Sequence, residues 1–94
     1  MDFKYESDRI YLENEKGECI AEVTFPKVSE NKVNVNHTYV DGSLRGQGVA
    51  DKLMTALAKD LKKSNKKAVA TCSYAVDWFE KHPEYSDLTT TERR

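Results

Sequence analysis

The chain has 94 residues, which is enough for one domain with one modest core and too few for a two-domain enzyme. Apolar residues make up 38% of the sequence and charged residues 33%, a balance typical of a globular domain and not of a disordered chain. Lys and Arg number 15 against 16 Asp and Glu, and this formal net charge of -1 argues against a nucleic-acid partner.

The N-terminal stretch MDFKYESD mixes acidic and basic residues and resembles no signal peptide. No apolar run approaches the ~18 residues that a membrane helix needs, so we expect a cytoplasmic protein with no membrane partner. Cys19 and Cys72 match neither zinc-site nor disulfide spacing. We therefore expect free thiols and no metal.

The first forty residues alternate polar and apolar side chains with a period of two, which is typical of antiparallel strands with one covered face. The pattern predicts four strands, at residues 3–7, 9–14, 19–25 and 32–40. In the fourth strand, the alternation predicts that Val33, Val35, His37 and Tyr39 share a face.

The period changes after residue 46. Val49, Leu53, Leu57 and Leu61 recur every four residues and predict a helix over about residues 47–63. The apolar run 68–72 predicts a buried strand parallel to the fourth strand, because a helix of this length makes a crossover connection. A second, short helix is expected to end near His82, since Pro83 follows.

These elements predict a single domain over residues 1–88 and a polar tail at 89–94. Its expected fold is α/β of the α+β type, with a mostly antiparallel mixed sheet, one β-α-β crossover and a short C-terminal helix.

Residues 40–50 carry the clearest functional signal, because there a strand end passes through a glycine-bearing loop into a helix N-terminus. The first N–H groups of a helix lack intrahelical partners and attract anions, and Gly46 and Gly48 bring no side chain that would block a phosphate. The glycines can equally serve only to allow unusual backbone dihedrals. Neither the P-loop pattern nor the dinucleotide fingerprint is present.

The segment Arg45-Gly46-Gln47-Gly48-Val49-Ala50 resembles the acyl-CoA loop of the GNAT acetyltransferase superfamily, R/Q-x-x-G-x-G/A. Together with His37-Thr38, Cys72-Ser73-Tyr74 and His82-Pro83-Glu84-Tyr85, it makes residues 5–88 similar to small, stand-alone GNAT-like N-acetyltransferase domains.

The resemblance implies that acetyl-CoA is the co-substrate and that an amine is the acceptor. It also implies that backbone N–H groups of residues 45–50 hold the CoA pyrophosphate. The strand ending at Tyr39 and Val40 would diverge from the Cys72 strand to admit the pantetheine arm.

Acetyl transfer has two routes here. In the first, His37 lowers the thiol pKa of Cys72, which becomes acylated in a two-step reaction. In the second, the amine attacks the thioester directly, a backbone N–H of the fourth strand polarises the carbonyl, and Tyr74 protonates the departing sulfur. Cys72 can also be a small core residue, and Tyr74 an aromatic cap of the sheet.

Two other functions stay open beside the acetyltransferase. One is an acyl-CoA-binding module without catalysis, which would use the same loop. The other is a Cys-His thioesterase, in which water resolves an acyl-Cys72 intermediate.

Overall fold

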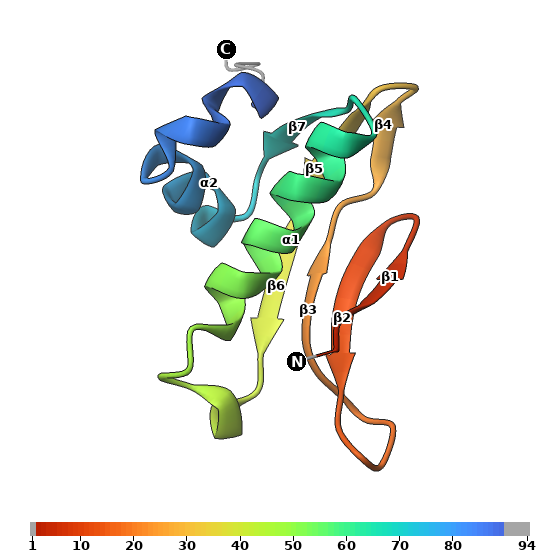
Figure 1. Cartoon of the computed structure of the whole chain (residues 1–94), viewed down its shortest axis with the longest axis vertical. Coiled ribbons are helices and arrows are strands. Elements are labelled where there is room, and N and C mark those ends of the chain that lie inside the picture. The colour runs from red at the N-terminus through yellow and green to blue at the C-terminus, as the bar shows by residue number, and fades with distance from the viewer. Residues whose placement is uncertain (1, 90–94) are drawn as a thin grey trace.

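The computed structural model of the chain describes residues 2–89 (Figure 1). Its strands are β1 (Lys4–Glu6), β2 (Arg9–Glu13), β3 (Cys19–Thr24), β4 (Lys27–Ser29), β5 (Lys32–Val35), β6 (His37–Val40) and β7 (Lys67–Ala70). Its helices are α1 (Val49–Lys63) and α2 (Ser73–Glu80), with two short 3-10 helices, η1 (Gly42–Leu44) and η2 (Pro83–Leu88).

The strands form two sheets. The first has the order β1-β2-β3-β6 and is antiparallel throughout, and the second has the order β4-β5-β7. In the second sheet β7 runs parallel to β5, which confirms the predicted parallel pairing across the crossover helix. The predicted mixed, mostly antiparallel α+β fold is therefore confirmed.

The predicted fourth strand is divided at Asn36. Its first half, β5, pairs with β7, and its second half, β6, pairs with β3. Figure 1 shows the two halves following one another, with β7 beside the upper half and β3 beside the lower half. Asn36 itself turns toward Thr24, since its N–H donates to the Thr24 carbonyl at 3.2 Å and its Oδ1 accepts from Thr24 Oγ1 at 2.6 Å.

This division makes the predicted face of His37 wrong. Val33 and Val35 are buried as expected, but His37 is exposed and the half-buried residue is Thr38. One residue inserted between two ladders shifts the alternation by one, so that every later side chain changes face. The same shift leaves Tyr39 41% exposed and turns Val40 toward the core.

Three further details differ from the expectation. Strand β4 was not predicted, because its three residues are too few to show a periodic pattern, and none of them is buried. Helix η2 begins at Pro83, whose fixed φ suits a first helical turn. Thr89 forms a parallel bridge with Ala68 and is not part of a free tail, and residues 90–94 lie outside the described residues.

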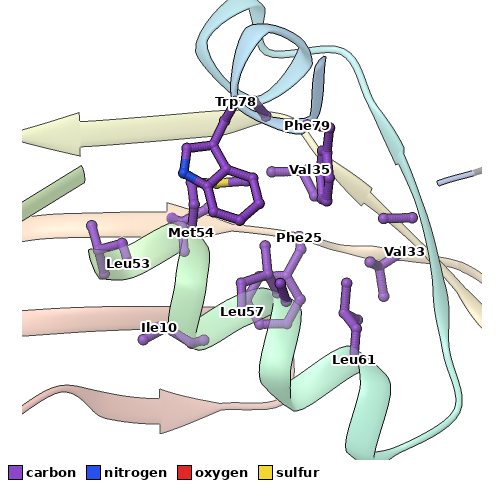
Figure 2. Close-up of a cluster of buried hydrophobic side chains, with 14 of the residues drawn as sticks. Ile10, Phe25, Val33, Val35, Leu53, Met54, Leu57, Leu61, Trp78 and Phe79 are labelled. Atoms are coloured by element: carbon purple, nitrogen blue, oxygen red, sulfur yellow. The ribbon is translucent and has the colours of Figure 1, made fainter. Parts of the chain in front are cut away.

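Helix α1 covers the sheets with one apolar face. Its buried residues are Val49, Leu53, Met54, Leu57, Ala58 and Leu61, at the spacing that the sequence predicted. Figure 2 shows Leu57 beside Phe25, the residue that follows β3. It also shows Met54 beneath the ring of Trp78, which belongs to α2. Within residues 2–89, no helix is long and apolar enough to cross a membrane.

Candidate active site

The loop between β6 and α1 begins with a carboxylate that organises it. Asp41 Oδ2 accepts hydrogen bonds from the backbone N–H of Ser43 at 3.0 Å and from Ser43 Oγ at 2.6 Å, and Oδ1 accepts from the Tyr39 hydroxyl at 3.2 Å. The bonds from Ser43 and Tyr39 lower the pKa of Asp41. The carboxylate is therefore the cap that starts η1 and turns the chain toward α1.

Both loop glycines have a left-handed backbone. Gly46 has a φ of 83° and Gly48 a φ of 69°, a region that other residues rarely adopt. A Cβ at either position would meet nothing within 4 Å, so the surface above the loop is open. The glycines therefore allow a backbone conformation that other residues rarely adopt, and they also leave the loop open to a phosphate. The two interpretations of these glycines are compatible with each other.

The glycine turn leaves a row of backbone N–H groups without partners. Arg45 and Gln47 donate within the loop, to the carbonyls of Gly42 at 3.2 Å and Leu44 at 3.3 Å. Among the described residues, by contrast, the N–H groups of Gly46, Gly48, Val49 and Ala50 have no acceptor. These four amides lie at the positive end of the α1 dipole, which makes them suited to an anion.

Cys72 lies where the second sheet meets α2. Its backbone N–H and that of Thr71 both donate to the Val35 carbonyl, at 3.2 and 3.0 Å, so the end of β5 holds the residue in place. Cys72 is also the N-cap of α2, and its Sγ lies 3.5 Å from the Thr38 hydroxyl oxygen of β6. The side chain is half-buried and its thiol is free.

The surroundings of Cys72 favour the thiolate. Burial alone would raise the pKa of the thiol, but hydrogen bonds from the Thr38 hydroxyl and from the N–H groups of Ala75, Tyr74 and Thr38 act in the opposite direction. Together they place the pKa of Cys72 below its ordinary value. A half-buried thiolate at a helix N-terminus is a competent nucleophile.

The structure does not bring His37 to Cys72. His37 lies on the opposite side of β6, where its Nε2 is 3.9 Å from Glu22 Oε2 and its side chain is 55% exposed. The position expected for His37 is taken by Thr38, which was not among the predicted site residues. The only signal for Thr38 was its place in the His37-Thr38 pair, because the change of face at Asn36 has no counterpart in the period-two pattern.

The edge of β6 that is not paired with β3 lies near Cys72. Asp41 N–H donates to the Ile20 carbonyl at 2.8 Å, and in an antiparallel ladder alternate residues point their N–H groups toward the partner strand. The N–H groups of Thr38 and Val40 therefore point away from β3. The Thr38 N–H donates to the Cys72 sulfur, so the Val40 N–H is the remaining donor at this edge of β6.

Tyr74 lies two residues beyond Cys72, in the first turn of α2. Its ring is half-buried against the core, and burial, followed by the charges of Asp51 and Asp77, raises the pKa of its hydroxyl. The phenol is therefore protonated at neutral pH and can act as a proton donor.

Replacing the Thr38 hydroxyl tests the cause of the lowered Cys72 pKa. We expect Thr38→Val to move the pH midpoint of Cys72 alkylation by iodoacetamide upward and to slow alkylation at neutral pH, because only the thiolate reacts. Mass spectrometry of the alkylated chain over a pH series measures the rate. Thr38→Ser, which keeps the hydroxyl, should behave like the wild type, and an unchanged midpoint in the valine variant would contradict the assignment.

Comparison with known proteins places the chain in a family. The model of the GCN5-related N-acetyl-transferase family matches residues 9–88, which is most of the chain. The solution structure of a GCN5-like protein from Staphylococcus aureus is 31% identical and covers 99% of this chain and 91% of its own, with a TM-score of 0.80. No curated protein matches the sequence.

Larger acetyltransferases share the fold at lower identity. A ribosomal-protein-alanine N-acetyltransferase from Brucella melitensis is 20% identical over 92% of this chain and 62% of its own, with a TM-score of 0.59. Tetrahymena GCN5 is 18% identical over 78% of this chain and 48% of its own, also with a TM-score of 0.59. The chain thus spans about half to three fifths of these two proteins.

The chain belongs to the GCN5-related N-acetyltransferase family, and its family and fold make it an acyltransferase. Members of this family use acetyl-CoA.

Proposed function

We propose that the chain is an acetyl-CoA-dependent N-acetyltransferase that moves an acetyl group from CoA to an amine acceptor. The observation that carries this proposal is the row of free amides behind two left-handed glycines, at the start of the helix that crosses over from β6 to β7. Membership of an N-acetyltransferase family supports acetyl transfer as the reaction, and the thiol of Cys72 beside β6 is a candidate nucleophile.

The amides of Gly46, Gly48, Val49 and Ala50 are the groups that would hold the CoA diphosphate. Arg45 and Gln47 are in the loop sequence, but their own amides are used inside the loop, so any contact from them would come from their exposed side chains. When bound, acetyl-CoA supplies an activated thioester. Tyr39 and Val40 line the neighbouring edge of β6, where the acyl-bearing arm would lie.

Two routes for the acyl group follow from the side chains. In the first, the Cys72 thiolate attacks the acetyl carbonyl and CoA leaves as its thiolate. The amine then attacks the acyl-cysteine, the Cys72 thiolate leaves, and the proton lost by the amine passes to solvent. In the second, the amine attacks directly, the Val40 N–H supports the oxyanion, and the Tyr74 hydroxyl donates a proton to the departing sulfur. We favour the first route, because the Thr38 hydroxyl lies 3.5 Å from the Cys72 Sγ at the N-cap of α2 and hydrogen bonds at this place lower the pKa of the thiol. We assign no base role to His37, which lies beside Glu22 on the other side of β6.

The release of free CoA tests the function. We expect the purified chain to release CoA thiol from acetyl-CoA when a mixture of primary amines is present, and little without them, as read by a colorimetric thiol assay. Release in water alone would identify a thioesterase. Acetyl-CoA binding by calorimetry without release under either condition would identify a binding module, and absence of both would contradict the proposal.

We also propose a cytoplasmic location without a membrane or nucleic-acid partner. The two free thiols, Cys19 and Cys72, suit a reducing compartment, and the net charge of -1 provides no field toward polyanions.

A further inference from the structure

Asp51 puts a negative charge beside the amides that would bind a diphosphate. It is the third residue of α1 and the acidic residue of its first turn. A carboxylate at this position usually turns back toward the free N–H groups of its own helix. In this chain such a contact would compete directly with a phosphate for the same donors.

The Asp51 side chain is held in another direction. Among residues 2–89, no side chain caps the start of α1, and Asp51 Oδ1 instead accepts a hydrogen bond from the indole Nε1 of Trp78 on α2, at 2.7 Å. Trp78 is 3% exposed, so this bond is formed by a ring that the core fixes. Figure 2 shows the ring against Met54, with its nitrogen on the side of Leu53 and the first turn of α1.

His82 supports the same arrangement from the end of α2. Its ring stacks on the Trp78 ring at 3.9 Å between centroids and 16° between planes, and its Nδ1 lies 2.7 Å from the Trp78 carbonyl oxygen. Its Nε2 lies 3.6 Å from the same Asp51 oxygen. The Asp51 carboxylate is therefore oriented toward α2 by two rings.

We propose that Trp78, supported by His82, is a positioning residue that holds the Asp51 carboxylate away from the amides of Gly48, Val49 and Ala50 and keeps them available to the CoA diphosphate. The inference rests on the proposed function. This positioning would explain how an acidic residue in the first turn of α1 is compatible with anion binding there. It would also assign the buried indole N–H of Trp78 a role in ligand binding in addition to the packing of its ring.

A double-mutant cycle tests this role. Trp78→Phe keeps an aromatic ring but removes the N–H, and we expect it to weaken acetyl-CoA binding about five- to tenfold, the effect of a charge moved toward a helix N-terminus. In Trp78→Phe/Asp51→Ala, affinity should return to within about twofold of Asp51→Ala alone, since no carboxylate is left to compete. Calorimetry measures the dissociation constants, and Asp60→Asn, near the far end of α1, controls for net charge.

A second pair of variants leaves Trp78 intact and so keeps the test valid if the phenylalanine variant fails to fold. Asp51→Glu carries the charge on a side chain one methylene longer, which reaches the Gly48 N–H more readily than aspartate and no longer fits the bond to the Trp78 indole, and Asp51→Gln is its neutral match. We expect the glutamate variant to bind acetyl-CoA more weakly than the glutamine variant. Equal affinities in this pair would overturn the inference.

These experiments distinguish a failure of the proposed positioning role of Trp78 from a failure of the proposed acetyltransferase function. If the wild-type chain does not bind acetyl-CoA, the proposed function fails and the inference with it. If the wild type binds but Trp78→Phe weakens binding equally with and without the Asp51 carboxylate, the tryptophan only packs, and the inference alone is overturned.

Discussion

Gly48→Asp is expected to abolish measurable acetyl-CoA binding, with a loss of at least ~100-fold in affinity. The new carboxylate would lie among the free amides at the start of α1, take their hydrogen bonds and repel the diphosphate. A Cβ at this position meets nothing within 4 Å, so the structural cost is the left-handed φ of 69°, about 1 kcal/mol for a non-glycine residue. Calorimetric titration with acetyl-CoA measures the effect.

Gly48→Asn is the matched control for this variant. Asparagine has the same size as aspartate and tolerates the left-handed region, but it carries no charge. We expect it to bind acetyl-CoA more weakly than the wild type and clearly more tightly than the aspartate variant. If Gly48→Asp bound acetyl-CoA with wild-type affinity, this loop would not be part of the acetyl-CoA binding site.

Cys72→Ala is expected to reduce the rate of acetyl transfer on the order of 10³-fold if the chain transfers the acyl group through its own sulfur, as we propose. Acetyl-CoA binding should change little, because the amides that would hold the diphosphate belong to another loop. Intact-mass spectrometry of the wild type after mixing with acetyl-CoA, without an amine, should also detect an acetyl group on Cys72.

The second cysteine provides the control. Cys19 is exposed on β3, and Cys19→Ala should keep both acetyl transfer and acetyl-CoA binding. Full activity of Cys72→Ala would exclude the two-step route and leave direct attack, with Tyr74 as proton donor, as the mechanism of the transferase.

The sequence alone determined the elements whose signals are local. The four-residue spacing from Val49 to Leu61 predicted α1 correctly, since one helical face must be apolar to cover a sheet. The interpretation of Gly46 and Gly48 as residues that allow unusual dihedrals is confirmed by their positive φ, which few other residues adopt. The anion site at the same loop stays a proposal. The family resemblance rested on this loop together with three shorter segments, and it is confirmed by the match over residues 9–88.

Only the tertiary structure decided which side chains meet at the candidate site. Asn36 ends one ladder and starts another, and this single inserted residue exchanges His37 for Thr38 beside Cys72. The contact between Asp51 and Trp78 joins two helices that are distant in the sequence. Period-two and helical patterns describe which face of an element is covered, but the partner on that face depends on long-range pairing, which no local pattern contains.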